Sequence, residues 1–467
     1  MDDFWQTFFD CESRGFEFLK GNVWQIYSYD IVVTLSPGDH SIGVTGSAQG
    51  TILAETCDEL RFLLGLNVAQ RNHTLVDVRS LRCSGQERPA VPDEHMFSIE
   101  LDHTASCGDT VVLEFDYRSV PIARKCWVNS TAGGPVPGLG DGETELCFEG
   151  YWLPFANVLY QPVTAEVKIV DRSGRQVIFN GKLLETSDDG SATTYRYRTC
   201  TPTMPTVIAG DFGLAAKPIG ADSSICFYHQ PGHEGIAGAV VELAADVFGR
   251  FVDWLGVNPL QGQDFGLVQL KRSSFGQYAP FPLVIFPEQD IAPTMGDDAW
   301  QRLTGMLGHE IAHFWFGGHV RSRPDEQWLS EGFAQYMNLL TIEAAYGRSA
   351  LNAELCRYVE AVATVDTQNQ PPLCGIPMSY QGQPLLVRLK GALVLHALRQ
   401  AVTLDGFRLF LATLVDRYGG DELNTDAVEA VCRDCFPEMD VATFFDLHLR
   451  RVATFEWDAA AEVVTTR

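Results

Sequence analysis

The stretch Gly308-His309-Glu310-Ile311-Ala312-His313-Phe314-Trp315-Phe316-Gly317 determines how the rest of the chain is interpreted. It contains the pattern H-E-x-x-H. His309 and His313 are four residues apart, so on a helix both imidazoles would project from one face, one turn apart. That spacing suits two ligands of a tetrahedral Zn²⁺ ion, and Glu310 beside them is placed to take a proton from a metal-bound water. A helix is expected because apolar residues recur at helical spacing, at Leu303, Met306, Leu307, Ile311 and Phe314.

A third metal ligand is expected from the segment that follows, Trp328-Leu329-Ser330-Glu331-Gly332-Phe333-Ala334-Gln335-Tyr336. Glu331 is the natural candidate, because with the two histidines it gives a His₂Glu set with an open fourth position. We therefore expect one Zn²⁺ per chain, held by His309, His313 and Glu331. Glu310 is expected to be catalytic. It would have no purpose in a merely structural zinc site, which argues against a non-catalytic interaction module.

Composition limits the partners of the chain. Its 467 residues include 34 Lys and Arg against 60 Asp and Glu, for a formal net charge of −26. This acidic balance argues against nucleic acid or an anionic membrane surface as a partner. No apolar run reaches the roughly 18 residues of a membrane span, and the first ten residues lack the pattern of a signal peptide. The twelve cysteines are expected to be mostly free thiols, so a cytoplasmic location is predicted.

The pattern of apolar residues changes near residue 214. Before it, segments such as 29–35, 111–117 and 165–170 alternate like strands and are separated by turn residues, which favours packed β-sheets. After it, helical spacing begins at 236–255 and dominates from residue 298. The predicted fold class is α+β with two domains. An all-β saddle or sandwich is expected at 1–214 and an α+β catalytic domain at 215–467.

The motif segments resemble those of the zinc aminopeptidases among the gluzincin metallopeptidases, a family that includes alanyl and puromycin-sensitive aminopeptidases and the leukotriene epoxide hydrolase. The family patterns H-E-[LI]-[AG]-H-x-W-F-G and W-L-N-E-G-[FL]-A-x-Y are matched nearly throughout by 309–317 and 328–336. The segment 390–399 resembles the family's later K/R-G-A-x-x-L-x-x-L helix. The resemblance implies a thermolysin-like catalytic domain after the β-domain. The resemblance leads us to expect only the two-domain core in these 467 residues, without the family's large C-terminal helical domain.

Departures from the family pattern bear on the substrate. One residue fewer separates His313 from Glu331, and the loop 318–327 is expected to absorb the difference. The family's G-x-M-E-N segment, aligned by register with 283–286, corresponds to 276–280 here. Ala279 then stands where the resemblance places the Glu that binds the α-amine of the substrate, and a methyl group cannot replace that carboxylate. Aminopeptidase activity is therefore expected to be weak, with Gly276, Gln277, Tyr278 and Ala279 as the substrate-binding residues.

A further departure concerns the oxyanion. Arg388 stands where the resemblance places a Tyr that stabilises the tetrahedral intermediate. Its guanidinium could replace the phenol as a charged donor, or could bind a carboxylate or phosphate of the substrate. Tyr380, eight residues earlier, is a second candidate for the phenol. Arg388 and Tyr380 therefore join Glu310 as predicted catalytic residues.

Two functions are compatible with these residues. The leading hypothesis is a zinc-dependent hydrolase that cleaves an amide or peptide bond by Glu310-assisted attack of a zinc-bound water. The alternative is a zinc enzyme on the same scaffold that acts on a non-peptide small molecule, by epoxide opening, cyclisation or trimming. In both cases the predicted partner is a peptide or small-molecule substrate that can carry an anionic group.

Overall fold

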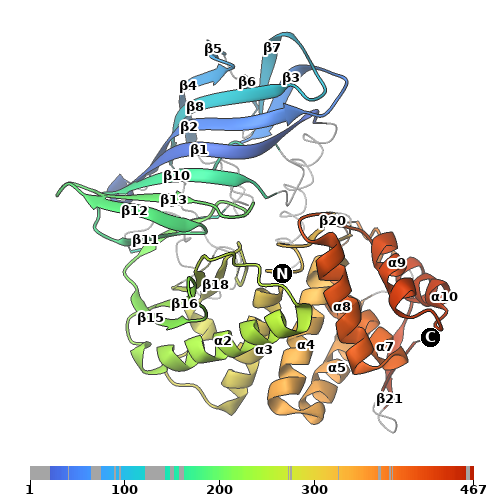
Figure 1. Ribbon diagram of the computed structural model, residues 1–467. Helices are drawn as coiled ribbons and strands as arrows, with labels where there is room; N and C mark the ends of the chain where they lie inside the picture. The colour runs from blue at the N-terminus through green and yellow to red at the C-terminus, as the bar shows by residue number, and fades with distance from the viewer. Residues whose placement is uncertain are drawn as a thin grey trace. The chain divides into compact units, whose positions relative to one another are not determined.

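The computed structural model describes residues 22–39, 41–64, 75–88, 91–93, 96–120, 142–147, 152–156, 162–271, 273, 276–323, 326–365, 370–377, 380, 382–458 and 463–466. Strands dominate the first part of the chain and helices the later part (Figure 1). The predicted α+β class, with a β-rich part followed by a largely helical part, is confirmed. None of the helices among the described residues has the length and apolar character that crossing a membrane requires.

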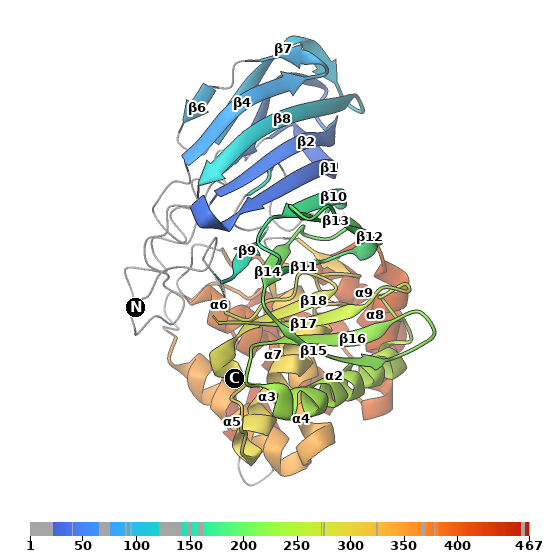
Figure 2. The same ribbon diagram turned by 90° about the vertical axis from the view of Figure 1, so that its left-hand side faces the viewer.

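An eight-stranded sheet is the main feature of the N-terminal part, with the strand order β12-β13-β10-β1-β2-β8-β4-β5 (Figure 2). Its central strand β1 pairs in parallel with β10 and antiparallel with β2. Tyr29, Ile31, Val33 and Leu35 of β1 are buried in the hydrophobic core. They alternate with less buried residues because successive side chains of a strand point to opposite faces. The strand expected at 29–35 is therefore part of β1.

The strands of this part have the following bounds: β1 (Trp24–Ser36), β2 (Ser41–Ile52), β3 (Thr56–Leu63), β4 (Leu75–Cys83), β5 (Gln86–Glu87), β6 (Val91–Asp93), β7 (Met96–Ser106), β8 (Thr110–Val120), β9 (Thr144–Leu146), β10 (Thr164–Asp171), β11 (Gln176–Phe179), β12 (Lys182–Asp188), β13 (Thr193–Arg198), β14 (Val207–Gly210), β15 (Gly213–Pro218), β16 (Ser224–His229), β17 (Phe265–Leu270) and β18 (Leu283–Pro287). Two three-stranded sheets, β11-β14-β9 and β3-β7-β6, accompany the large sheet. β17 and β18 pair in parallel.

The helices follow mostly after residue 233: α2 (Glu234–Leu255), α3 (Asp297–Ala312), α4 (Phe333–Tyr346), α5 (Arg348–Ala363), α6 (Gln383–Leu385), α7 (Gly391–Ala401), α8 (Leu404–Tyr418), α9 (Thr425–Cys435) and α10 (Val441–Phe445). Three π-helical turns lie at Trp328–Gly332, Leu386–Lys390 and Asp446–Arg450. Short strands among them are β19 (Arg321–Ser322), β20 (Glu422–Leu423), β21 (Phe455–Asp458) and β22 (Val463–Thr466). Two π-helical turns directly precede α4 and α7, so each opens a longer helix.

Contacts divide the chain into two compact units. The first comprises Met1–Leu214, Tyr228–His233 and Gln263–Gln289, and the second comprises Ala215–Phe227, Glu234–Gly262 and Asp290–Arg467. The chain first crosses from the first unit to the second between Leu214 and Ala215, inside β15. The pattern of apolar residues also changes there. The functional division into a β-domain at 1–214 and a catalytic domain at 215–467 stays a prediction.

Two helices of the second unit, α3 and α4, pack against each other closely. Gly308 of α3 makes this possible, since a Cβ atom there would lie 3.2 Å from the Cα atom of Asn338 and 2.9 Å from Oγ1 of Thr341. Trp315, which follows the H-E-x-x-H pattern, supports α3 on another side. Trp315 is fully buried and donates its indole N–H to the carbonyl of Val257 at 3.0 Å. These contacts fix the helix that carries the H-E-x-x-H pattern.

Candidate metal centre

His309 and His313 lie on one face at the end of α3, as their spacing predicts. α3 begins with Asp297 and Asp298, whose carboxylates suit the positive end of the helix dipole, and it ends at Ala312. The two imidazole rings are 4.8 Å apart between centroids and nearly perpendicular. Their Nε2 atoms face each other at 3.2 Å. Two nitrogen donors therefore converge on one point.

Glu331 approaches the same point from the π-helical turn Trp328–Gly332. Its Oε2 lies 3.5 Å from Nε2 of His309 and its Oε1 lies 3.6 Å from Nε2 of His313. Four donors at about 2.0–2.1 Å around a tetrahedral zinc ion are about 3.3–3.4 Å from one another. The observed separations match that geometry. In the part of the chain that the structure describes, these are the only three His, Cys, Asp or Glu side chains grouped in this way.

The protonation states of the ligand candidates suit a metal ion. Burial, together with the nearby guanidinium of Arg388, lowers the pKa of His309 to about 3, so its imidazole is neutral at neutral pH. Burial opposes ionisation of Glu331, but the imidazoles of His313 and His309 and the Arg388 guanidinium outweigh it and hold the pKa of Glu331 well below its ordinary value. A neutral imidazole and an ionised carboxylate are the forms that bind zinc.

Glu310 has a different electrostatic environment from Glu331. It is buried, with 4% of its surface exposed, and burial raises its pKa to about 7 even though His313 and Arg388 favour the carboxylate. A carboxyl group with a pKa near neutrality can both accept and return a proton during a reaction, which is the property expected of a general base and acid. Glu310 is therefore suited to proton transfer beside the two histidines.

The orientation of His313 is set by two hydrogen-bond partners. Its Nδ1–H donates to the carbonyl of Phe316 at 3.1 Å, and Oγ of Ser330 lies 3.2 Å from the same nitrogen while donating its own proton to that carbonyl. A donor at Nδ1 leaves the lone pair of Nε2 directed at the metal position. Sequence reasoning did not identify Ser330, although its position next to Glu331 is a usable signal. Nδ1 of His309 is buried and has no hydrogen-bond partner among the described residues.

Zinc binding to the metal-free protein is expected to release a proton from Glu310. Because a dication favours the carboxylate, it should lower the raised pKa of Glu310, and a proton should leave between about pH 4.5 and pH 7. Isothermal titration calorimetry in buffers of different ionisation enthalpy measures this release. At pH 6 the protein should release up to about one proton more per zinc than the Glu310→Gln variant, and the difference should vanish above about pH 8. Equal proton release by both proteins at pH 6 would contradict the expectation that zinc lowers the pKa of Glu310.

Arg388 lies on the second π-helical turn, Leu386–Lys390, next to the ligand candidate Glu331. Its Nε is 3.5 Å from Oε2 of Glu331, and 45% of its side chain is exposed to solvent. The guanidinium thus contacts a ligand candidate on one side and remains accessible on the other. Tyr380 makes no hydrogen bond to His309, His313, Glu310 or Glu331 among the described residues, and its ring packs near Gly382. Of the two further residues predicted to be catalytic, Arg388 and Tyr380, the structure places Arg388 beside the ligand candidate Glu331.

The predicted substrate-binding segment lies in the first unit. Gly276 adopts a positive φ of 78°, and Tyr278 forms an isolated bridge with Ile285 through hydrogen bonds of 2.9 and 3.1 Å. The phenol of Tyr278 donates to Oε1 of Glu145 at 2.7 Å. The segment that contains Tyr278 therefore contacts β18 through this bridge to Ile285. The contact of Gly276, Gln277, Tyr278 and Ala279 with a substrate stays a prediction.

Comparison with known proteins identifies the later part of the chain. Residues 266–447 match the peptidase family M1 domain. The chain is 35% identical over 108 residues to endoplasmic reticulum aminopeptidase 2 of Homo sapiens, covering 23% of this chain and 10% of that protein. It is 26% identical over 129 residues to glutamyl aminopeptidase of Bos taurus, covering 26% of this chain and 13% of that protein. The matches thus span only a small part of the length of these two relatives.

Solved structures share the fold over nearly the whole chain. The M1 zinc metallopeptidase of Deinococcus radiodurans superposes with a TM-score of 0.72 at 18% identity, covering 92% of this chain and 94% of that one. A variant of that enzyme bound to a Tyr-Ser-Ala substrate gives a TM-score of 0.70 at 19% identity, covering 91% and 94%. Residues 266–447 thus match the peptidase family M1 domain, and the fold over nearly the whole chain is that of an M1 zinc metallopeptidase.

Proposed function

We propose that the protein is a zinc-dependent peptide hydrolase in which His309, His313 and Glu331 bind one Zn²⁺ and Glu310 is the general base. The observation that carries this proposal is the convergence of two Nε2 atoms and a carboxylate at 3.2–3.6 Å, the separations of a tetrahedral site. Three protein ligands leave a fourth position open, which is typical of catalytic zinc rather than structural zinc. Glu310 beside the ligands supplies the base that hydrolysis needs.

The chain's own residues divide the work of the reaction. When bound, the zinc ion polarises the substrate carbonyl and lowers the pKa of a water molecule. Glu310 accepts the proton of the attacking water and returns it to the leaving nitrogen, which its pKa of about 7 permits near neutral pH. Phe316 and Ser330 hold the His313 ring, so the lone pair of its Nε2 stays directed at the metal position.

We propose that Arg388 contacts negative charge on the substrate, either the oxyanion that develops during the reaction or a carboxylate or phosphate group. Its guanidinium lies beside Glu331 and is 45% exposed, so it can also face a substrate. A charged donor in that position would stabilise an oxyanion, and it would equally favour a substrate with a carboxylate or phosphate. Tyr380 remains the second candidate for the oxyanion contact.

Recognition of a free α-amine is the property we expect to be weak. The curated relatives are named aminopeptidases and a solved relative holds the peptide Tyr-Ser-Ala, which supports a peptide substrate. In this chain, however, Ala279 offers a methyl group where the family pattern has a carboxylate. Loss of a buried charge partner costs about 2–5 kcal/mol, or roughly 30-fold to several thousandfold in affinity for an ammonium group. The alternative of a non-peptide substrate has no observation in its favour over peptide hydrolysis.

A substrate panel tests both specificity statements. We expect acidic or N-blocked peptides to be cleaved faster than aminoacyl anilides, and Arg388→Ala to lower kcat/KM for the acidic substrates by roughly 10- to 150-fold, the value of one charge-assisted hydrogen bond. Arg417→Ala is the matched control, because Arg417 is similarly exposed and pairs with Asp434 on α9. Family-like rates on aminoacyl anilides would contradict the role given to Ala279, and equal losses in both arginine variants would contradict the role given to Arg388.

We also propose a cytoplasmic location. The ten cysteines among the described residues are all free thiols, several of them buried, as expected in a reducing compartment. Fractionation of expressing cells tests this. A protein found outside the cytoplasm would contradict the proposal.

A further inference from the structure

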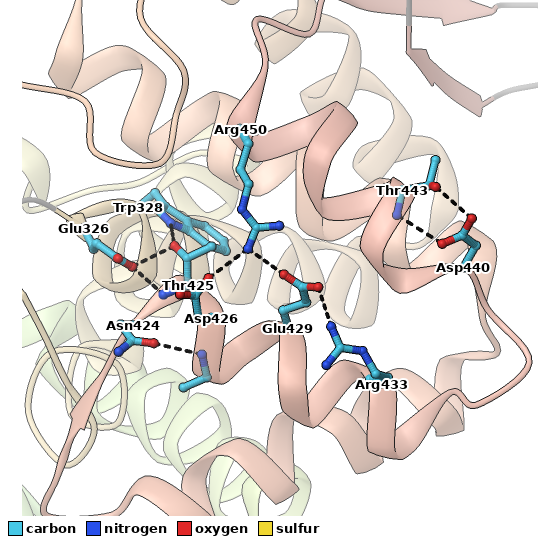
Figure 3. Close-up of polar contacts among 11 residues, drawn as sticks. Glu326, Trp328, Asn424, Thr425, Asp426, Glu429, Arg433, Asp440, Thr443 and Arg450 are labelled. Carbon is cyan, nitrogen blue, oxygen red and sulfur yellow. Dashed lines mark hydrogen bonds and ion pairs between the residues drawn. The ribbon is translucent and has the colours of Figure 1, made fainter.

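Helix α9 contributes a side chain to the segment that carries Glu331. Thr425 is the first residue of α9 and has 1% of its surface exposed. Its hydroxyl accepts a hydrogen bond from the indole Nε1 of Trp328 at 3.0 Å and donates one to Oε2 of Glu326 at 2.7 Å (Figure 3). Trp328 opens the π-helical turn that contains Glu331, and Glu326 lies two residues before it. The hydroxyl of Thr425 thus links Glu326 and Trp328. They lie just before and at the start of the turn Trp328–Gly332, which we call the ligand turn.

The carboxylate of Glu326 is well placed to make this contact strong. It also accepts the backbone N–H of Thr425, one of the free N–H groups at the start of α9. Asn424 caps the same helix by accepting the N–H of Ala427 at 2.8 Å. A carboxylate at a helix N-terminus is favoured by the helix dipole. Glu326 is therefore held to α9 through both the backbone and the side chain of Thr425.

The other end of the ligand turn is fixed by a glycine contact. A Cβ atom on Gly332 would lie 3.0 Å from the Cα atom of Gly391, and a Cβ on Gly391 would lie 2.9 Å from the Cα atom of Gly332. That Cβ on Gly332 would also lie 3.0 Å from the carbonyl oxygen of Val387, so the turn carrying Glu331 touches the turn carrying Arg388 and the start of α7 through backbone. The hydrogen bonds of Thr425 fix the other end, where the side-chain amide of Gln383 also donates to Oε1 of Gln327. Thr425 is 94 residues beyond Glu331, and its hydrogen bonds go to Trp328 and Glu326 rather than to the ligand candidates.

We propose that Thr425 is a positioning residue for the zinc site, acting through Trp328 and Glu326 to hold the carboxylate of Glu331 at the distance that zinc requires. The inference rests on the proposed ligand set. It adds that α9, which contributes no ligand, sets the metal affinity. Outer partners of metal ligands typically change affinity by about 10–100-fold, and the indirect path through Trp328 places Thr425 at about tenfold.

The test compares zinc affinity with global stability. Thr425→Val keeps the shape of the side chain and removes the hydroxyl, so we expect the zinc dissociation constant to rise about tenfold. Loss of a buried hydrogen-bond partner costs about 1–3 kcal/mol, so the unfolding midpoint of the metal-free protein should fall modestly while the protein stays folded. Thr425→Ser should restore the parent affinity. Thr443→Val is the matched control, because Thr443 bonds Asp440 in the same way at the start of α10, away from the ligand turn (Figure 3).

A second variant keeps the inference testable if Thr425→Val fails to fold. Trp328→Phe removes the indole N–H and keeps an aromatic ring, so it should weaken zinc binding by a similar factor. If both variants fold, the double variant should bind zinc about as weakly as Thr425→Val alone, because both single variants remove the hydrogen bond between Trp328 and Thr425. Parent affinity in Thr425→Val or in Trp328→Phe, or equal weakening by Thr443→Val, would overturn the positioning role. Parent affinity in Glu331→Ala would instead overturn the proposed ligand set.

Discussion

Glu310→Gln is expected to lower kcat for peptide hydrolysis by about 10²–10⁴-fold and to leave zinc at about one ion per chain. The amide has nearly the shape of the carboxyl group but cannot accept the proton of the attacking water. Glu310 has only 4% of its surface exposed, so solvent is poorly placed to substitute for it. Steady-state kinetics with metal analysis of the same preparation gives both quantities.

The control for this variant is a second Glu→Gln change away from the site. Glu360 lies on the exposed side of α5, and Glu360→Gln should leave kcat and zinc content unchanged. If Glu310→Gln kept the parent kcat with full zinc, the reaction would not pass through proton transfer to Glu310. If it lost zinc, Glu310 would have to be counted among the groups that hold the metal.

His309→Ala and His313→Ala are expected to reduce zinc affinity by roughly 10²–10³-fold each and to remove activity in proportion. Zinc sites with four protein ligands bind with about 10–16 kcal/mol, so one ligand accounts for roughly 3 kcal/mol. The effect arises at the metal itself, because both Nε2 atoms point at the same position. Competition with a chelator of known affinity measures the dissociation constant.

His319→Ala provides the control for the histidine variants. It follows the zinc helix by a few residues, and its backbone N–H and carbonyl bond to Phe314 and Gly420 regardless of the side chain. Its variant should keep parent zinc affinity. Full zinc occupancy in His309→Ala or His313→Ala at low free zinc would contradict the assignment of those two ligands.

The parts of the site that sequence could predict are those encoded locally. The spacing of His309 and His313 is meaningful because an α-helix brings residues four apart to one face, and α3 does this. Glu331 was predictable as the nearest suitable carboxylate after the helix, and it lies within 3.6 Å of both histidines despite the shorter loop. Such features need only the geometry of one helix and the chemistry of one metal.

The parts that sequence could not predict depend on contacts between distant segments. The ion pair of Arg388 with Glu331 and the hydrogen bonds of Thr425 with Trp328 join residues far apart in the chain. The π-helical turns add another difficulty, since their extra residue shifts side chains relative to an α-helix without a distinct sequence pattern. The grouping of residues 263–289 with the first unit is a further example. These residues, which include β17 and β18, follow the helix α2 in the chain. One change of the apolar pattern near residue 214 therefore does not indicate that the chain returns to the first unit.

The most direct test of the central claim is anomalous diffraction from crystals of the zinc-loaded protein, with data collected on both sides of the zinc absorption edge. The account predicts one strong anomalous peak per chain at about 2.0–2.2 Å from Nε2 of His309, Nε2 of His313 and a carboxylate oxygen of Glu331. A fourth position should be open to water. A peak bound by other side chains, or no peak at this point in crystals whose zinc content is one per chain, would contradict it.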